Sequence, residues 1–429
     1  MGYATPTADG IDLSQRLAPR LDRLIAFRRD IHAHPEVGHA EHRTTERIAE
    51  ALKTEGLSPR LLPGTGLVCD IGDDDGSGRL GLRADIDALP LQDESGAPYA
   101  STIPGVAHAC GHDVHTTVVL GAGVLLAEAA RRGELQQGVR LIFQPAEEST
   151  PGGALDVVRS GALDGVTRLL ALHCDPATDV GRVGLRVGPI TSASDHVLVR
   201  LNGPGGHTSR PHLTADLVFA LGQVITGVPA ALSRRLDPRA GVSLVWGRTS
   251  AGGASNAIPR TGVVEGTLRC LRVEAWEEAA GLLPEIVQDV VAPYGVTAHV
   301  EHTPGVPPVV NDESTVVLMD LAGRFELGED GVVPTEQSLG GEDFAWYLPH
   351  VPGALGRLGT RTPGGRTYDL HQGDFDVDER AIDVGVRLLA RAALENGWGA
   401  VSPSAATATP QVAPETVPDG VQVARPVDR

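Results

Sequence analysis

The chain has 429 residues, of which 41% are hydrophobic and 21% charged, and its formal net charge is −19. A chain of this length exceeds one ordinary domain, so we expect two domains with sizeable cores. The negative charge repels nucleic acid and anionic membranes, which excludes both as expected partners. No apolar run approaches the roughly 18 residues that span a membrane, and the N-terminus lacks a signal-peptide pattern, so we expect a cytoplasmic protein.

Residues 15–189 alternate predicted helices with short apolar strands. Pro35 stops the first helix, and Gly56 closes the second as a C-cap. Near-continuous apolar strands between helices are typical of an α/β domain with a largely parallel central sheet, because such strands are buried on both faces. We expect helices at residues 22–34, 44–56 and 113–132, and strands at 66–72, 79–87, 139–148 and 167–175.

Residues 190–304 predict a separate small domain. Strands and helices follow there in the order β-α-β-β-α-β, the ferredoxin-like or split βαβ pattern. Because this pattern is complete by itself, we interpret it as an α+β insertion into the α/β domain. The α/β pattern then resumes and closes with a helix at residues 378–397. The predicted division is 15–189 and 305–399 for the α/β domain, 190–304 for the insertion, and 400–429 for a disordered tail rich in Pro, Ala and Thr.

The densest cluster of metal-binding residue types is HACGHDVH, at residues 108–115. Its cysteine and three histidines lie within eight positions, and Gly111 lets its neighbours Cys110 and His112 point at one centre. Thiolate and imidazole together suit zinc and other divalent ions of borderline softness. The alternative is that Cys110 is a small buried residue and that the histidines cap a helix.

Five further candidate residues lie at the ends of predicted apolar strands or precede the last helix. Glu147 and Glu148 are adjacent carboxylates at a strand end, so one can bind metal while the other faces the substrate. Asp85 can hold a metal-bound histidine by its second nitrogen, or bind metal itself. Each alone is more often a loop or capping residue, but the carboxyl ends of strands are where open α/β sheets hold their sites. His173 follows the apolar residues of the strand at 167–175, and His371 lies shortly before the last helix.

These motifs, together with HAHPE, GPGGHTSRPH, SNAIP, GTLR and GGEDFAWY, resemble the M20 metallopeptidases. The similarity is to the amidohydrolase branch, with its hippurate hydrolases, auxin-conjugate hydrolases and N-acyl amino acid deacylases, and it covers about residues 15–398. It implies a di-metal aminopeptidase-like catalytic domain with an inserted lid domain that forms a homodimer. It also implies two divalent ions per subunit (Mn²⁺, Zn²⁺ or Co²⁺) and hydrolysis of the amide bond of N-acyl amino acids.

The resemblance also assigns roles to individual residues. Glu147 resembles the general base, and His207 resembles a histidine that the lid domain sends into the partner's site. Asn256 and Arg269 resemble residues that contact the substrate carboxylate. Arg210 stands where many relatives carry a small residue. The implied metal ligands are Cys110, as a bridge between the ions, with His112, Glu148, His173 and His371; Asp85 is expected behind them.

Two other functions remain open on the sequence alone. The first is a dipeptidase or carboxypeptidase of the same fold, although no anionic pocket for a free α-amine is evident. The second is a non-catalytic metal-binding protein, which would have no need of a base such as Glu147 beside the metal. No Gly-x-Gly-x-x-Gly motif follows a strand and no Gly-x-Ser-x-Gly motif occurs, so dinucleotide binding and serine hydrolysis have no support.

Overall fold

The computed structural model describes residues 10–73 and 76–396 of the chain. Its largest element is an eight-stranded sheet with the order β1-β2-β4-β3-β5-β16-β6-β15. The predicted tail at residues 400–429 lies outside the described residues. The strands of this sheet are β1 (Arg60–Leu61), β2 (Leu67–Ile71), β3 (Arg79–Asp85), β4 (Gly138–Gln144), β5 (Val166–Asp179), β6 (Val183–Leu185), β15 (Val332–Pro334) and β16 (Gly353–Arg361).

The four central strands β4, β3, β5 and β16 run parallel, as the sequence predicts. The outer strands depart from that pattern, because β2 pairs antiparallel with β1 and β4, and β6 pairs antiparallel with β16. Side chains alternate between two buried cores along β5: Leu170 and Leu172 face one, Leu169 and Ala171 the other. Burial on both faces therefore explains the continuous apolar runs.

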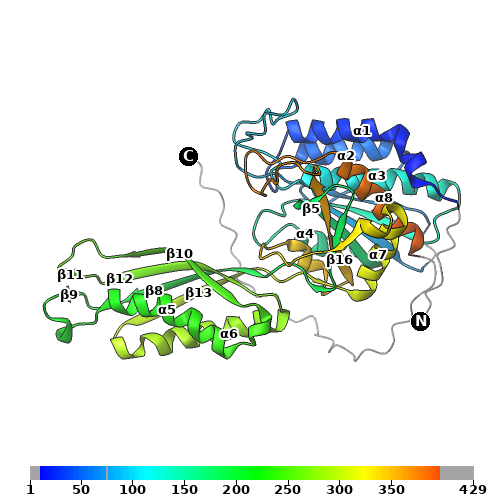
Figure 1. Ribbon diagram of the computed structural model, residues 1–429. Coiled ribbons are helices and arrows are strands. Elements are labelled where there is room, and N and C mark those ends of the chain that lie inside the picture. The colour runs from blue at the N-terminus through cyan, green and yellow to red at the C-terminus, as the bar shows by residue number, and fades with distance from the viewer. Residues whose placement is uncertain (1–9, 74–75, 397–429) are drawn as a thin grey trace. The chain divides into compact units, whose positions relative to one another are not determined.

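Helices cover both faces of the sheet (Figure 1). One core joins the sheet to the helices α1 (Leu13–Ala33), α2 (His42–Thr54), α3 (His112–Arg131), α7 (Glu313–Leu327) and α8 (Arg380–Glu395). The second core joins the opposite face to α4 (Ala154–Arg159) and the 3₁₀ helix η5 (Asp343–Tyr347).

Strand β16 is central to the sheet but was not predicted from the sequence. Its sequence, GALGRLGTR, contains three glycines, which have low strand propensity. The glycines are needed for close packing. A Cβ on Gly356 would lie 2.9 Å from a methyl carbon of Leu172, and a Cβ on Gly359 would lie 2.3 Å from the carbonyl oxygen of Asp179.

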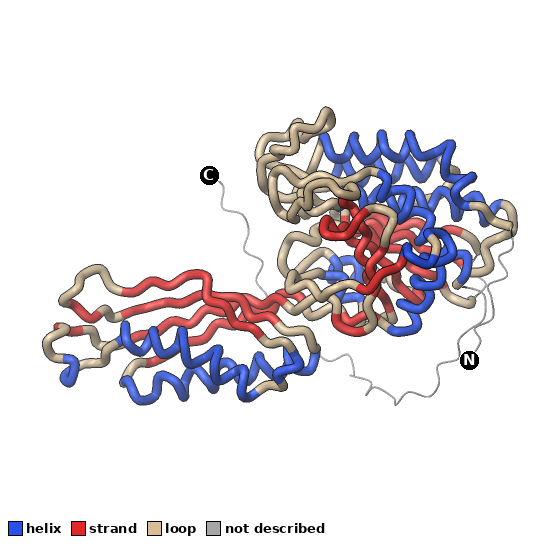
Figure 2. The backbone as a smooth tube through the Cα atoms, viewed as in Figure 1, coloured by secondary structure: helices blue, strands red, loops and turns tan. Residues whose placement is uncertain are grey.

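Residues 194–306, here called the inserted unit, show the predicted order β-α-β-β-α-β. Four antiparallel strands lie in the order β10-β12-β8-β13. The helices of the inserted unit pack on this sheet (Figure 2). Val199, Leu221 and Leu283 belong to its own core. The division of the chain at residues 190 and 304 stays a prediction. The elements are β8 (Ser194–Asn202), α5 (Leu217–Arg235), β10 (Ser243–Ala251), β12 (Thr261–Arg269), α6 (Val273–Val291) and β13 (Thr297–Val306).

Short elements complete the described chain. Two two-stranded sheets pair β7 with β14 and β9 with β11. Their strands are β7 (Gly188–Pro189), β14 (Val310–Asn311), β9 (Gly206–His207) and β11 (Ala257–Ile258), and the remaining 3₁₀ helices are η1 (Pro211–Leu213), η2 (Pro238–Ala240), η3 (Ala292–Tyr294) and η4 (Glu329–Gly331).

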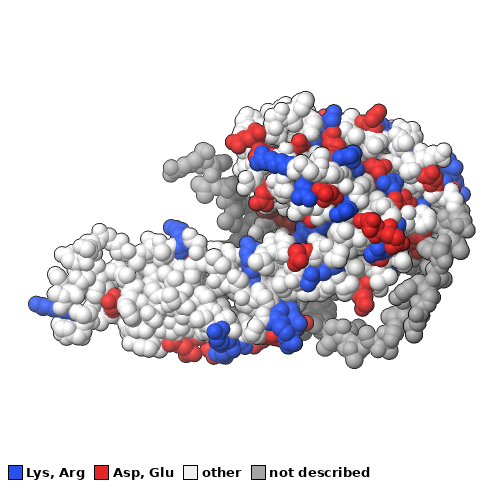
Figure 3. All heavy atoms as spheres, in the orientation of Figure 1, with Lys and Arg blue, Asp and Glu red and all other residues white. Residues whose placement is uncertain are grey.

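Two helices, α3 and α5, are long and apolar enough to cross a membrane by length and composition alone. The core explains this for α3, because 89% of its apolar window is buried. Only 33% of the α5 window is buried, so much of its apolar surface is exposed, including Val218 and Phe219. Figure 3 shows few charged side chains over this part of the inserted unit.

Candidate metal centre and active site

Cys110 and His112 are brought together by the turn that begins α3. Gly111 lies between them with φ +85°, a left-handed conformation that glycine adopts without strain. A Cβ on Gly111 would also lie 2.6 Å from the sulfur of Cys174. Both the backbone angle and the packing therefore require glycine here. Cys110 and His112 are 5% and 1% exposed.

The five predicted metal ligands form two groups of donor atoms that share Cys110. His112 and His173 complete one group, and Glu148 and His371 complete the other; within each group all ligand atoms lie within 4.8 Å of one another. Cys110 Sγ is 3.5 Å from His173 Nε2, and His371 Nε2 is 3.1 Å from Glu148 Oε1. Cys110 therefore belongs to both groups, and its role as a bridge between two ions stays a prediction.

Asp87, which the sequence analysis did not single out, orients His112. The ring Nδ1 of His112 lies 3.0 Å from the carbonyl oxygen of Asp87 and 3.2 Å from its Oδ1. The other ring nitrogen, Nε2, is buried and has no hydrogen-bond partner among the described residues. Asp87 Oδ2 also accepts from the backbone N–H of Glu148, at 2.9 Å. Asp87 thus contacts the side chain of one predicted ligand, His112, and the backbone of another, Glu148. Residues behind metal ligands typically make such contacts.

Asp85 was expected to support a metal-bound histidine or to bind metal itself, and it lies in one donor group with His112 and His115, with its Oδ2 3.8 Å from Nε2 of His112. Its Oδ1 lies 2.6 Å from Nδ1 of His115, whose Nε2 accepts the backbone N–H of Cys174 at 2.8 Å. Both ring nitrogens of His115 are therefore occupied within the protein. The hydrogen-bond contacts of Nδ1 of His112 are with Asp87, two residues further along the same motif, and the role of Asp85 stays a prediction.

His108, the first histidine of the cluster, belongs to none of the donor groups. It is 2% exposed, and neither ring nitrogen has a hydrogen-bond partner among the described residues. Burial lowers the pKa of His108 to about 3, so the ring is neutral. Of the four cysteine and histidine residues in this motif, only Cys110 and His112 belong to the two donor groups that share Cys110.

The loop that carries Glu147 and Glu148 is held by Glu41, another residue that the sequence analysis missed. Ala146 precedes the two carboxylates and has a left-handed backbone, with φ +55°. Its N–H donates to Glu41 Oε1 at 2.7 Å, and Glu41 Oε2 accepts from the hydroxyl of Thr65 at 2.6 Å. Glu41 is fully buried, so this contact fixes an otherwise unfavourable turn immediately before Glu147.

Glu147 lies in a strongly acidic environment. Its ligand atom is within 4.8 Å of those of Glu342 and Asp343 in the GGEDF motif, and its Oε2 is 3.9 Å from His112 Nε2. Burial, followed by the neighbouring carboxylates of Glu342 and Glu148, raises the pKa of Glu147 well above its ordinary value. A raised pKa is the property of a carboxylate that accepts and returns protons.

The donor set fits divalent cations. At a tetrahedral centre with metal–sulfur bonds of about 2.3 Å and metal–nitrogen bonds of about 2.0–2.1 Å, two ligand atoms lie roughly 3.3–3.6 Å apart. The separations of 3.5 Å and 3.1 Å are close to this range. Burial raises the pKa of the Cys110 thiol, so a thiolate there needs an adjacent cation. The buried Nε2 of His112 has no hydrogen-bond partner among the described residues, which leaves this nitrogen available to a cation.

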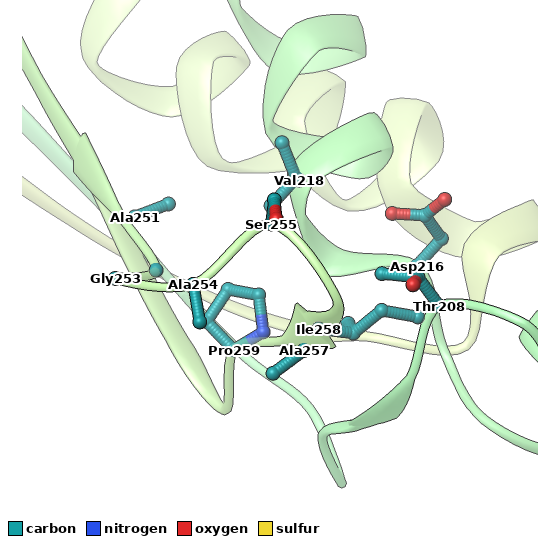
Figure 4. A pocket seen from close by; sticks show the side chains of 11 residues that line it. Thr208, Asp216, Val218, Ala251, Gly253, Ala254, Ser255, Ala257, Ile258 and Pro259 are labelled. Atoms are coloured by element: carbon teal, nitrogen blue, oxygen red, sulfur yellow. The ribbon is translucent and has the colours of Figure 1, made fainter.

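The three predicted residues of the inserted unit do not join these groups. His207 and Asn256 are exposed and lie near each other, since β9 pairs with β11 and the N–H of Thr208 donates to the carbonyl oxygen of Asn256. The adjacent hollow has a volume of about 460 Å³. Figure 4 shows Thr208 and Asp216 on one side of it and the loop that carries Ser255 on the other.

Arg269 lies at the other end of β12 from Asn256. Its guanidinium donates to the carbonyl oxygen of Leu339, in the segment that leads to Glu342. Strand β12 has nine residues, so its ends are about 26 Å apart at ~3.3 Å per residue. Asn256 and Arg269 of one chain are therefore too far apart to bind the same small carboxylate.

The fold and this donor set are those of a dinuclear metallohydrolase. The chain belongs to peptidase family M20/M25/M40, whose model matches residues 81–395. Its relatives place it in the amidohydrolase branch of that family. Family, fold class and enzyme class therefore agree with what the sequence motifs imply.

Particular relatives are similar over most of the chain. N-acetyl-L-cysteine deacetylase of Bacillus subtilis is 38% identical over 84% of this chain and 85% of its own length. The YxeP protein of Bacillus subtilis, a dinuclear metal-binding peptidase of the M20 family, has a TM-score of 0.78 and 34% identity, with 89% of this chain and 99% of that chain covered. A Rhodococcus jostii protein named "Putative glutamate–cysteine ligase 2-3" is 46% identical over 89% of this chain. The chain spans about half of that relative's length, 48%.

We expect Cys110→Ser to weaken metal binding far more than Cys69→Ser. Both side chains are buried, but Cys69 lies in the core of the sheet, whereas Cys110 is common to both donor groups. The measurement is metal content by elemental analysis after dialysis against a weak chelator. Equal metal loss in the two variants would contradict the assignment of Cys110 as a ligand.

We expect Asp87→Ala to lower metal affinity by about 10- to 100-fold, the usual effect of removing a residue behind a metal ligand. The carboxylate that orients His112 and the N–H of Glu148 is then missing. Affinity is measured by competition with a chromogenic chelator. Asp156→Ala, at an exposed carboxylate on α4, is the control and should bind metal like the wild type. An unchanged affinity in Asp87→Ala would show that the backbone carbonyl alone orients His112.

Proposed function

We propose that this enzyme hydrolyses the amide bond of N-acyl amino acids and releases a carboxylic acid and a free amino acid. The observation that carries the proposal is the sharing of Cys110 by two donor groups, with Glu147 immediately beside them. The similarity to a deacetylase of N-acetyl-L-cysteine and to a dinuclear metal-binding peptidase supports the same kind of reaction.

Cys110, His112, Glu148, His173 and His371 would hold two divalent cations. When bound, these cations would polarise the amide carbonyl and lower the pKa of water. We propose Mn²⁺, Zn²⁺ or Co²⁺, because cysteine, histidine and carboxylate ligands together suit ions of borderline softness.

Glu147 is the proposed general base and acid. One of its carboxylate oxygens takes a proton from the attacking water as the water oxygen bonds to the amide carbon. The same carboxyl then gives the proton to the nitrogen as the carbon–nitrogen bond breaks, so that a neutral amine leaves. The backbone contact between Ala146 and Glu41 keeps the loop of Glu147 in place through both steps.

His207 is the proposed donor to the oxyanion that forms on the carbonyl oxygen, and Asn256 and Arg269 are proposed to bind the substrate carboxylate. The length of β12 prevents one chain from offering Asn256 and Arg269 to one substrate. We therefore propose that a second copy supplies His207 and Asn256, and that each complete site combines residues of two subunits.

The surface of the inserted unit supports such a homodimer. Helix α5 has no charged residue between Leu217 and Ser233, and Val218 and Phe219 are 51% and 54% exposed. Strand β10 lies at the edge of its sheet and exposes Val245. An apolar helix face beside an unpaired strand edge is a typical protein–protein interface.

An amine-release screen tests the proposed reaction. Purified enzyme, depleted of metal and reloaded with each of the three ions, is incubated with acetyl-, benzoyl- and long-chain acyl amino acids and with dipeptides. Release of amine from acyl amino acids supports the proposal. Release from dipeptides alone would instead identify a dipeptidase or carboxypeptidase of the same fold.

We expect Glu147→Gln to lower kcat by about 10²–10⁴-fold, the contribution that general acid–base catalysis usually makes, with little change in metal content. Glu50→Gln, at an exposed carboxylate of α2, is the control and should keep the wild-type kcat. Near wild-type kcat in Glu147→Gln with normal metal content would rule out Glu147 as the base.

We expect His207→Ala and Glu147→Gln to complement each other when mixed under conditions of subunit exchange. A mixed dimer has one site with both an intact base and an intact partner histidine, so activity recovers to roughly a quarter to a half of wild type, from counting sites in a two-fold dimer. Subunit exchange is verified with differently tagged chains. No recovery despite verified exchange would disprove the role of His207 in the partner's site.

A further inference from the structure

Among the described residues, Arg357 is exceptional as a buried cation that lacks a partner. Five arginines there are at most 8% exposed, and four of these contact a carboxylate. No described residue forms a hydrogen bond or ion pair with the guanidinium of Arg357, which is itself 8% exposed. The four paired arginines are Arg28 with Asp113, Arg79 with Asp70, Arg83 with Asp85, and Arg391 with Glu326.

Arg357 lies beside the metal-binding residues. It pairs in register with His173 across the parallel strands β16 and β5, which are about 4.8 Å apart, so the two side chains leave the same face of the sheet. On its other side Arg357 pairs with Gly184 of β6. A Cβ on Gly184 would lie 3.3 Å from the Cβ of Arg357, so the glycine leaves room for the arginine side chain.

The acidic groups near Arg357 are too far from its guanidinium to form an ion pair with it. Burial lowers the pKa of Arg357, while Glu342, Asp175 and Cys110 raise it from beyond ion-pair distance. An arginine recruited to neutralise the acidic site would contact a carboxylate directly, as Arg83 does. A buried guanidinium without such a contact is costly, and that cost is offset when an anion binds it.

We propose that Arg357 binds a carboxylate of the substrate, and that the enzyme consequently prefers N-acyl amino acids with a second acidic group. This inference rests on the proposed function. The α-carboxylate is assigned to Arg269 on the inserted unit, whereas Arg357 belongs to the central sheet and adjoins a metal ligand. A planar guanidinium can hold a carboxylate by two parallel hydrogen bonds. The second acid belongs either to the acyl group or to the side chain of the amino acid.

Two pairs of substrates distinguish these two positions. N-succinyl-L-alanine is compared with its terminal amide, and N-acetyl-L-glutamate with N-acetyl-L-glutamine. We expect wild-type enzyme to favour the acid over the amide in one pair by about 10- to 100-fold in kcat/KM, the usual range for a hydrogen bond to a charged group. The pair in which the acid is preferred identifies the part of the substrate, acyl group or amino acid side chain, that binds Arg357.

Arg357→Met should reduce that preference to about one, mainly through KM, while metal content and thermal stability stay close to wild type. Arg361→Met is the matched control, because Arg361 lies on the same strand but already binds Asp179 at 2.7 Å. This control should retain the wild-type preference for the acid. Arg357→Lys, which keeps the charge but not the planar pair of donors, should show an intermediate preference.

Direct binding provides a readout that does not depend on turnover, and the comparison in the wild type does not depend on the folding of a variant. By calorimetry, wild-type enzyme should bind succinate at least about ten times more tightly than succinamate, and Arg357→Met should bind both equally. The inference is wrong if the wild type shows no preference for the acid, in turnover or in binding. It is also wrong if Arg357→Met lowers kcat/KM for acids and amides by the same factor. Absence of amine release from every acyl amino acid would instead reject the proposed function.

Discussion

Several buried carboxylates lie together at the carboxyl edge of the central sheet, and their mutual repulsion has to be offset by positive charge. Arg83 resolves part of this problem: its fully buried guanidinium contacts Asp85 and Asp343 at 2.8 Å and Glu342 at 3.0 Å. It thereby ties β3 to a segment some 260 residues away in the sequence. Removing one partner of a buried ion pair typically costs about 3–5 kcal/mol, so this contact fixes the strand ends on which the site depends.

The carboxylates that do not contact Arg83 make the carboxyl edge of the sheet suitable for binding cations. Glu147 and Glu148 lie beside cysteine and histidine donors, and Nε2 of His112 has no partner among the described residues. These groups are held in place from behind, by Asp87 at His112 and by Glu41 at the loop of Glu147. The protein therefore maintains a set of donors whose electrostatic cost is offset when cations bind.

The length of the inserted unit is a second constraint, because it limits which residues of one chain can contact the same substrate. Strand β12 separates Arg269, next to the loop of Leu339, from the end of the unit that carries His207 and Asn256. A small substrate cannot bridge that distance, so the two ends of one unit serve different sites if all three residues act on substrate. The exposed apolar face of α5 is consistent with the same two-subunit arrangement.

The sequence by itself determined the type of fold and the residue types at the site. Apolar runs between helices indicated the parallel sheet, and the order of elements in residues 190–304 indicated the inserted unit, because burial imposes a regular hydrophobic pattern on each element. The crowding of Cys110, His112 and their neighbours was also visible locally, because one cysteine and three histidines lie within eight positions.

Only the tertiary structure decided which residues meet. Asp87 contacts Nδ1 of His112, and His115 is held by Asp85 and the N–H of Cys174, because these contacts depend on how the end of β3 packs against α3. Strand β16 was not predicted, since its glycines serve close packing that leaves no hydrophobic pattern in the sequence. Arg357 became conspicuous only through the absence of a partner among the described residues, and such an absence depends on all the surrounding elements rather than on any local motif.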